Sequence, residues 1–175
     1  MVASDKIKPA FIRVSGALAK RPSLGLGTGI SKVTIQNGLT CEIREGNWTM
    51  IADMPEQAGG NAAGPAPGVF GRAALGSCLA IGYMMRASKM DIPIAKLEVE
   101  IQTDYDDGAL FGTSSSIIPP GYLEVRYLVT IDSDAPKEEI IRMLDDADKH
   151  SPYLDVFSRA QACCREVNIN GEKQV

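Results

Sequence analysis

The chain has 175 residues, which is enough for one ordinary domain with a sizeable hydrophobic core. Hydrophobic residues make up 45% of the sequence and charged residues 23%, a composition typical of globular proteins and not of disordered ones. The net charge of -4, without a basic stripe, argues against nucleic acid as the main partner. No apolar signal-type segment opens the sequence, so we expect a cytoplasmic protein whose four cysteines are reduced.

The sequence divides into an N-terminal extension, residues 1–29, and a single domain over residues 30–175. The extension is basic, ends in glycines and is expected to contain a short helix between residues 11 and 20. We expect this extension either to be mobile or to dock on a partner chain, with a targeting role as a further alternative.

Between residues 31 and 54, apolar and polar side chains alternate in three short runs, which predicts three antiparallel strands in a meander. The dipeptide Asn37-Gly38 between the first two runs is typical of a type I′ hairpin turn. Cys41, in the second run, lies on the same side as Ile43, so we interpret it as a small core residue.

A loop rich in Gly, Ala and Pro follows over residues 55–68, and Pro67 lies near the start of the next helix, where proline is favoured. Residues 73–85 carry no charge, and a helix that is apolar on every side is a buried helix. At about 1.5 Å per residue this run is about 20 Å long, too short to cross a bilayer. We therefore expect a core helix that ends near Lys89, has Cys78 near its middle and involves no membrane.

Two long strands are predicted over residues 94–106 and 121–134, because apolar side chains alternate with polar ones in both. Ser133 or Asp134 is expected to cap the helix that follows, with Pro136 in its first turn.

The last elements are a short helix from about Pro152 and a final strand over residues 162–169. Cys163 and Cys164 are expected on that strand, one facing the core and the other facing out. Antiparallel strands with long helices between them are typical of an α+β fold.

The glycine-rich loop, the proline before the central helix and the run that contains Cys78 resemble the OsmC/Ohr family (osmotically inducible protein C and organic hydroperoxide resistance). The resemblance covers about residues 31–170. The residues that carry it are Gly59-Gly60-Asn61, Gly64-Pro65, Pro67, Ala74-Leu75-Gly76-Ser77-Cys78, Asp134-Ala135-Pro136 and His150-Ser151-Pro152.

The resemblance implies an α+β, OsmC-like fold in which antiparallel sheets wrap around long central helices in an intertwined homodimer. Active sites then lie at the subunit interface. Small residues on the central helix suit close approach of a second helix: Ala73, Gly76, Ser77, Ala80 and Gly82.

Members of the family that reduce peroxides use two cysteines, of which the first is oxidised to a sulfenic acid and the second resolves it as a disulfide. By the resemblance, Cys78 matches the first cysteine and Ser151 occupies the position of the second. The glutamate that commonly follows the proline of the helix start is absent, because Gly68 and Val69 follow Pro67. Arg44 and Arg72 are the candidates for the arginine that polarises the thiol.

Three functions remain open at this point. The first is reduction of organic hydroperoxides through Cys78, with an external thiol in place of the second cysteine. The second is a non-catalytic dimer that binds a small apolar molecule, in which Cys78 is a structural core residue. The third is hydrolysis by Ser151 with His150, a histidine that could instead only cap a helix C-terminus.

No cofactor and no metal are expected. The sequence has one histidine, and Cys163 and Cys164 are adjacent, so their side chains cannot easily serve one tetrahedral site. Either of these two cysteines could alternatively act as a resolving thiol for Cys78.

Overall fold

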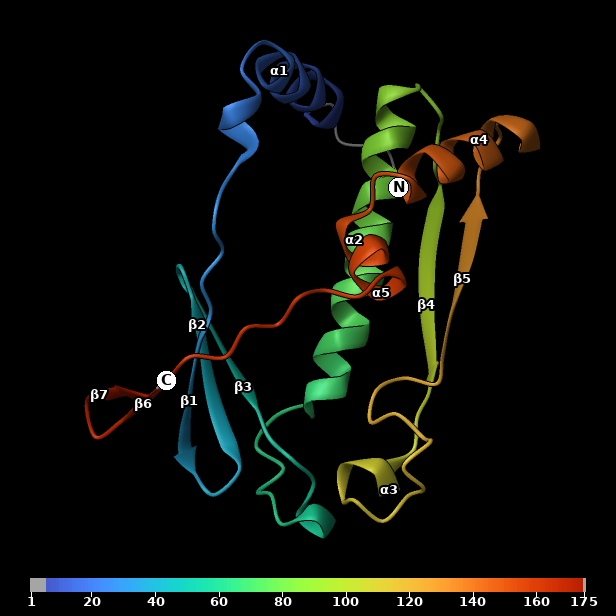
Figure 1. Cartoon of the computed structure of the whole chain (residues 1–175). Coiled ribbons are helices and arrows are strands. Elements are labelled where there is room, and N and C mark those ends of the chain that lie inside the picture. Colours follow the sequence, from blue (N-terminus) through green and yellow to red (C-terminus); the bar gives the residue numbers. More distant parts are fainter. Residues whose placement is uncertain (1–5, 175) are drawn as a thin grey trace.

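Helix α2 (Pro67–Lys89) is the axis of the structure, and the other helices and strands are arranged around it (Figure 1). The structure is a computed structural model and describes residues 6–174. Pro67 occupies the first turn of α2, where its fixed φ suits a helix and its missing N–H leaves no bond unmade. Arg86 and Lys89 lie in the last turn, where positive charge is favourable. The predicted central helix is therefore confirmed.

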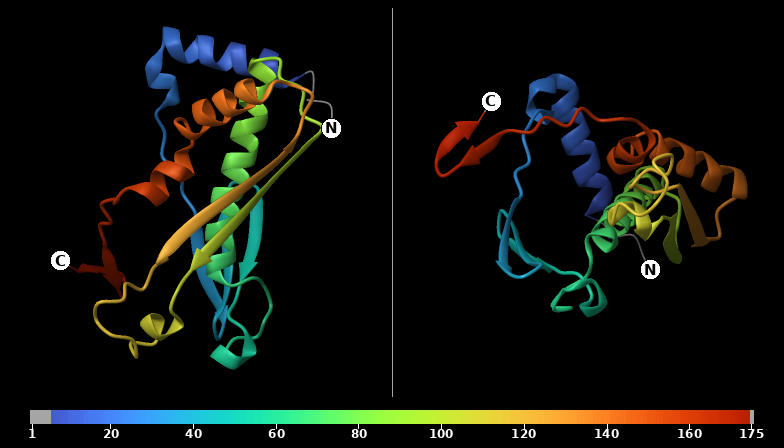
Figure 2. Two further views of the ribbon diagram at one scale, coloured as in Figure 1. Left: turned by 90° about the vertical axis from the view of Figure 1, so that its right-hand side faces the viewer. Right: turned by 60° about the horizontal axis from the view of Figure 1, so that its bottom comes forward.

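One face of α2 is buried against two strands and a second helix. Strands β4 (Lys96–Asp104) and β5 (Glu124–Asp132) pair antiparallel, and α4 (Lys137–Asp148) lies beside α2 at one end of these strands (Figure 2). The apolar residues that alternate along β4 pack against this core, as predicted. The buried side chains of the core are Leu75, Leu79, Tyr83, Ala87, Ile92, Ile94, Met143 and Ala147.

The opposite face of α2 carries an exposed row of residues at four-residue spacing, which are Ala73, Ser77, Ile81 and Met85. We call these four residues the open face of α2. Ile81 is 61% exposed, although it is an aliphatic residue in the middle of the central helix. The expectation of a helix buried on every side is therefore wrong for the single chain, because the described residues leave this face uncovered.

By length and composition alone, α2 could also cross a membrane, and among residues 6–174 it is the one helix that could. The whole helix has 23 residues, whereas the length predicted from the sequence covered only the uncharged run. Core helices of soluble proteins pass the same test. We interpret α2 as a core helix because Leu75, Leu79 and Tyr83 are almost completely buried within the protein.

Strands β1 (Lys32–Asn37), β2 (Thr40–Glu45) and β3 (Trp48–Ala52) form the predicted meander. The meander stands apart from α2 in Figure 1 and in the right view of Figure 2. All six residues of β1 are exposed, and so is most of β3. Cys41 is only half-buried, so its interpretation as a core residue does not hold within the single chain. The sheet lacks a surface in the described chain against which its apolar residues could pack.

Of the two Asn-Gly dipeptides in the chain, the one that was predicted to form a type I′ turn does not form it, whereas the other does. At the β1–β2 turn, Gly38 has a positive φ (57°) but Asn37 does not, so a hairpin forms without the two left-handed residues of a type I′ turn. At the second dipeptide both Asn170 (54°) and Gly171 (86°) are left-handed, as a type I′ turn requires. Strands β6 (Val167–Ile169) and β7 (Glu172–Gln174) flank this second turn.

This terminal hairpin corrects the prediction of a strand over residues 162–169. The strand starts only at Val167, because the tight turn pairs the last residues of the chain with one another. Cys163 and Cys164 precede it in an irregular segment, and both are exposed instead of alternating between core and solvent.

The buried carboxylate of Asp53 organises the loop that leads into α2. Its oxygens accept hydrogen bonds from Thr40 Oγ1 (2.7 Å) and from the backbone N–H groups of Met54 (2.7 Å), Asn61 (3.2 Å) and Ala63 (3.2 Å). A Cβ at Gly60 would lie 1.9 Å from the Met54 carbonyl oxygen, so only glycine fits there. The short 3₁₀ helix η2 (Glu56–Ala58) lies within this loop.

Helix α1 (Ile7–Lys20) starts earlier than predicted and packs on the C-terminal end of α2 (Figure 1). The ring of Phe11 lies between two cations, with Arg86 Cζ 5.2 Å and Lys89 Nζ 5.3 Å from its centroid. Lys8 also forms an ion pair with Asp91. A second short helix, η1 (Pro22–Gly25), follows α1. Helix α1 of the extension therefore docks on its own chain.

The start of α4 differs from the prediction. Pro136 is the N-cap residue, and neither Ser133 nor Asp134 caps the helix. The Ser133 hydroxyl accepts a hydrogen bond from Ala135 N–H (3.1 Å) and donates one to the Pro93 carbonyl, so it closes the turn before the helix instead. The remaining helices are α3 (Asp107–Leu110) in the loop between β4 and β5, and α5 (Pro152–Ser158) after α4.

Candidate functional site

Cys78 and Ser151, 73 residues apart in the sequence, lie side by side in the structure, with 3.5 Å between Cys78 Sγ and Ser151 Oγ. Cys78 lies near the middle of α2 and is half-buried. Ser151 precedes α5 and is buried. The two positions that the family resemblance pairs as reacting and resolving residues are therefore adjacent.

Local structure holds Ser151 in this place. Ser151 is the N-cap of α5: its Oγ accepts a hydrogen bond from Leu154 N–H (3.3 Å), and Pro152 fills the first helical position. Its own N–H donates to the Asp148 carbonyl oxygen (3.1 Å). Because the hydroxyl accepts from Leu154, its single proton is free to be donated to the sulfur of Cys78.

A carboxylate between two phenols fixes the turn that carries Ser151. Tyr83 donates a hydrogen bond to Asp148 Oδ1 (2.7 Å), and Tyr127 donates one to Oδ2 (3.0 Å). Burial, followed by the hydrogen bond to the carboxylate, raises the pKa of both phenols above the ordinary range, so they remain donors at neutral pH. The end of α4 is thereby attached to both α2 and β5.

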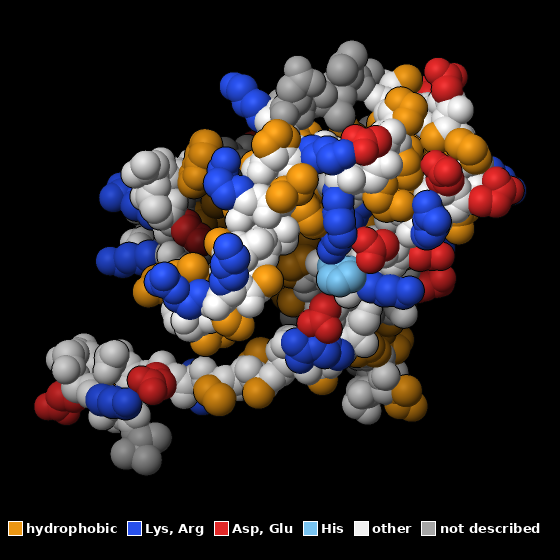
Figure 3. Space-filling model, turned by 90° about the horizontal axis from the view of Figure 1, so that it is seen from above, with side chains coloured by type: hydrophobic (Ala, Val, Ile, Leu, Met, Phe, Trp, Pro, Cys, Tyr) orange, Lys and Arg blue, Asp and Glu red, His pale blue; other side chains and the backbone are white. Residues whose placement is uncertain are grey.

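His150 is not brought to the site. Its Nδ1 lies 2.7 Å from the Asp146 carbonyl oxygen and 3.6 Å from Asp146 Oδ1, at the surface of α4. In Figure 3 the histidine is visible at the surface between acidic and basic side chains. It makes no hydrogen bond to Ser151 among residues 6–174, so the structure does not assemble the pair that hydrolysis would need.

Neither candidate arginine forms a hydrogen bond with Cys78 within the described chain. Arg44 lies on β2 and forms an ion pair with Glu42 (2.7 Å), and Arg72 lies in the second turn of α2 with its Nη1 3.5 Å from Thr103 Oγ1. The hydrogen-bond partner of Cys78 among residues 6–174 is Ser151. The described residues therefore place no arginine within hydrogen-bond distance of this sulfur.

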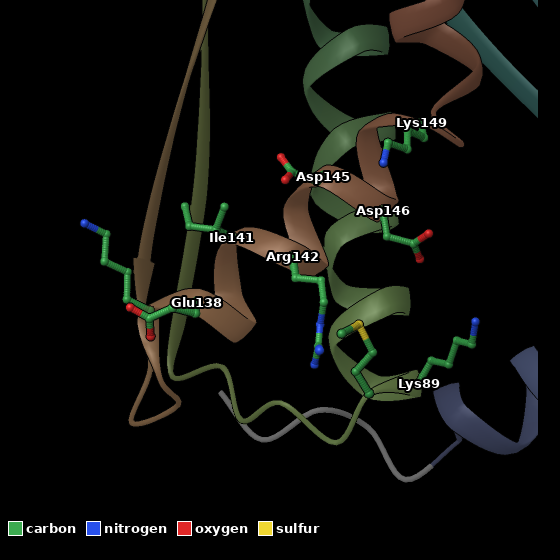
Figure 4. A pocket seen from close by; sticks show the side chains of 9 residues that line it. Lys89, Glu138, Ile141, Arg142, Asp145, Asp146 and Lys149 are labelled. Carbon is green, nitrogen blue, oxygen red and sulfur yellow. The ribbon is translucent and has the colours of Figure 1, made fainter.

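A groove of about 810 Å³ lies between the end of α2 and α4 (Figure 4). Figure 4 shows Lys89, Arg142 and Lys149 interspersed with Asp145 and Asp146, so neither sign of charge dominates. Cys78 does not line it. Over residues 6–174, no group of three or more His, Cys, Asp or Glu side chains is arranged to hold a metal ion.

A long central helix with a thiol, a crossing helix whose N-cap faces that thiol, and an antiparallel strand pair define an α+β protein of the OsmC-like class. The sequence of residues 59–163 matches the family described as OsmC-like protein, which is more than half of the chain. The chain therefore belongs to the OsmC-like protein family. The predicted family and the predicted α+β, OsmC-like fold are confirmed, whereas the intertwined dimer stays a prediction. No curated protein matches the sequence closely enough to count as a relative.

Solved structures share this fold. An OsmC-like protein from Mycoplasma pneumoniae superposes with a TM-score of 0.64 at 17% identity, covering 75% of this chain and 87% of that chain. A proposed osmotic stress induced and detoxification response protein from Psychrobacter arcticus superposes with a TM-score of 0.58 at 20% identity, covering 75% of this chain and 89% of that chain. An organic hydroperoxide resistance protein from Elizabethkingia anophelis superposes with a TM-score of 0.58 at 16% identity, covering 76% of this chain and 89% of that chain. At these identities the similarity establishes the fold alone.

Three features were not anticipated from the sequence. They are the hydrogen bonds to Asp53 in the loop before α2, the hydrogen bonds from Tyr83 and Tyr127 to Asp148, and the capping role of Ser151. A tyrosine inside an otherwise apolar helical run was a usable signal, because a buried phenol needs a hydrogen-bond partner. The pattern Ser151-Pro152 was another, since Ser followed by Pro is typical of a helix start.

Proposed function

We propose that this protein reduces organic hydroperoxides with Cys78 as the reacting residue and an external thiol in place of a second cysteine. The observation that carries the proposal is the 3.5 Å distance between Cys78 Sγ and Ser151 Oγ. It brings the candidate peroxidatic cysteine next to the position where the family resemblance expects the resolving cysteine. The fold shared with an organic hydroperoxide resistance protein supports it.

The proposed reaction has three steps. The Cys78 thiolate attacks the terminal oxygen of the hydroperoxide, the O–O bond breaks, and the alkoxide takes up a proton and leaves as an alcohol. The resulting sulfenic acid reacts with one external thiol, which releases water and forms a mixed disulfide. A second external thiol attacks that disulfide, releases Cys78 and leaves as the oxidised disulfide. Ser151 cannot take the second step, because a hydroxyl forms no disulfide.

Ser151 instead has a role in the first step. Its proton is free to point at the sulfur, and a hydrogen bond donated to a thiolate favours the charged form. Cys78 lies too far into α2 for the helix dipole to act on it. Reactive cysteines in proteins generally have a positive charge near the sulfur as well.

We further propose a homodimer that completes this site. The open face of α2 and the β1–β3 sheet both expose apolar residues that a second copy would cover, including Ile81, Val33 and Trp48. Arg44 lies on that detached sheet, so it is the candidate cation for Cys78 of the other copy. This arrangement would account for the lack of a hydrogen bond from an arginine of residues 6–174 to the thiol of the same chain.

The deciding experiment is stopped-flow oxidation of the reduced protein by cumene hydroperoxide, followed by trapping of the sulfenic acid. We expect wild type to form a sulfenic acid on Cys78, and Cys78→Ser to react at least a hundredfold more slowly. Cys41→Ser is the matched control, because it removes another half-buried thiol and should react like wild type. Equal rates for Cys78→Ser and wild type would refute the proposal.

The second candidate is a non-catalytic dimer that binds a small apolar molecule. Two observations favour it. Gly68 and Val69, and no glutamate, follow Pro67. No arginine of residues 6–174 forms a hydrogen bond with Cys78. Native mass spectrometry of the purified protein tests it. A retained apolar ligand, together with no peroxide reaction, would select this function over the first.

A further inference from the structure

A second cavity, of about 480 Å³, lies at the start of α2, between this helix and the loop that joins β4 to β5. Its volume falls in the range of small-molecule sites. Neither Cys78 nor Ser151 lines it. Its apolar walls come from several segments of the chain, among them Met54, Val69, Leu110, Pro120 and the ring of Tyr122.

The wall formed by Tyr122 is held rigidly. Its hydroxyl donates to the Gly68 carbonyl oxygen (3.1 Å), and its ring stacks on Phe157 with 6.1 Å between centroids. A Cβ at Gly71 would lie 3.1 Å from the Tyr122 hydroxyl, tighter than ordinary contacts. Glycine at position 71 therefore lets the ring approach α2, and the cavity is formed before any ligand arrives.

Arg72 supplies a positive charge in this apolar cavity. It is half-buried, and its only hydrogen bond among residues 6–174 is the long contact to Thr103 Oγ1 (3.5 Å). No carboxylate of these residues lies within 4.0 Å of its guanidinium. A guanidinium has five N–H donors, and charged groups that lose water are usually paired. The described residues therefore leave most of its N–H donors available to water or to a ligand.

Two acidic residues also line the cavity, and they limit the kind of ligand. Asp106 uses both oxygens within its own loop, accepting from Gly108 N–H (2.8 Å) and from Ser114 Oγ. Asp107 is exposed, so water and salt screen its charge. A ligand anion in this cavity is therefore expected to pair with Arg72, the cation among its lining residues.

The geometry points to this cavity as a binding site for a small amphipathic carboxylate, with its apolar part between Val69, Leu110 and Tyr122 and its carboxylate paired with Arg72. Two parallel N–H donors of one guanidinium match the two oxygens of a carboxylate. The inference goes beyond the proposed peroxide chemistry, because it concerns a different part of α2 and does not require Cys78.

Isothermal titration calorimetry of the full chain with octanoate tests the site. We expect octanoate to bind, octanol to bind at least tenfold more weakly because it lacks the carboxylate, and acetate not to bind because it lacks the apolar part. Arg72→Gln should weaken octanoate binding at least tenfold. Arg142→Gln, which removes the same charge from the groove of Figure 4, should bind as wild type does.

Each contrary outcome overturns the inference. These are failure of the wild-type protein to bind octanoate, equal binding of octanol, and wild-type affinity in Arg72→Gln. Failure of the wild-type protein to bind octanoate is the result expected if a carboxylate of a second copy already pairs with Arg72. Should Arg72→Gln not fold, Arg72→Lys replaces it, with at least threefold weaker binding expected because the paired donors are lost.

The test is independent of the peroxide reaction. Cys78→Ser should bind octanoate with wild-type affinity, whether or not Cys78 reacts with peroxides. Loss of octanoate binding in Cys78→Ser would show that the carboxylate lies at the thiol and not at Arg72, and would overturn the assignment of the site.

Discussion

Tyr83 donates a 2.7 Å hydrogen bond to Asp148 and thereby joins the middle of the central helix to the end of α4. Tyr83 is five residues after Cys78, and Asp148 is three residues before Ser151. One buried hydrogen bond thus sets the position of both candidate site residues relative to each other.

Removal of this bond should destabilise the protein measurably. Tyr83→Phe deletes the hydroxyl and leaves one oxygen of a carboxylate without its donor, which costs about 1.5–3 kcal/mol. Urea unfolding followed by circular dichroism measures the change. Tyr127→Phe is the matched control: because Tyr127 is more exposed than Tyr83, this substitution should lower the free energy of unfolding by less. Equal stability of Tyr83→Phe and wild type would contradict this role of the bond.

Restoring a second cysteine should restore an internal disulfide. In Ser151→Cys the new thiol lies where Oγ is now, 3.5 Å from Cys78 Sγ, so one equivalent of hydroperoxide should produce a disulfide between Cys78 and the introduced thiol. Intact mass spectrometry under non-reducing conditions shows the loss of two hydrogens.

The double variant with Cys78→Ser is the control for this disulfide, because it retains the new thiol without its partner. Persistence of a sulfenic acid in Ser151→Cys, with no disulfide, would show that the short distance between positions 78 and 151 does not allow a disulfide to form.

The central helix offers a matched pair of positions that separates core packing from assembly. Leu79→Ala should cost about 2–5 kcal/mol of unfolding free energy, because it leaves a cavity in the core. Ile81→Glu places a charge on the open face of α2 and should convert a dimer into monomers, since an unpaired charge is not tolerated in an apolar interface.

Light scattering coupled to size-exclusion chromatography measures the assembly. Ile117→Glu, on an exposed loop residue, is the control and should leave the oligomeric state unchanged. A monomeric wild-type protein, or a dimer that persists in Ile81→Glu, would count against a dimer built on this face.

Acid should loosen the loop before α2 through Asp53. The hydrogen bond from Thr40, together with the backbone N–H groups of the loop, holds the pKa of Asp53 below its ordinary value. A carboxyl whose folded pKa is lowered stabilises the fold above its unfolded pKa of about 3.9. That stability is lost as the pH falls through the lower, folded pKa.

Unfolding free energy measured from pH 6 down to pH 3 should therefore fall with a steeper slope in wild type than in Asp53→Asn. Asp53→Asn should also be less stable at pH 6, because it loses the charged acceptor. Thr40→Val should show an intermediate slope, since Thr40 makes the largest contribution to the lowered pKa. Parallel curves for wild type and Asp53→Asn would exclude this role for the carboxylate.

Local patterns in the sequence determined the secondary structure well. The uncharged run after Pro67 predicted the central helix, and alternation of apolar and polar residues predicted β1 to β5, because helices and strands repeat over a few residues. The motif around Cys78 was sufficient to indicate the family. Turn types were less predictable: the left-handed Asn-Gly pair lies at Asn170-Gly171 and not at the first hairpin.

Tertiary structure alone decided which distant residues meet. The contacts of Cys78 with Ser151, and of Tyr83 with Asp148, join segments separated by more than sixty residues, and no local periodicity encodes such pairings. The same holds for the exposure of Ile81 and the position of Arg72 in an apolar cavity. Local propensities set the helices and strands, whereas the packing of side chains against one another sets the chemistry that those helices and strands bring together.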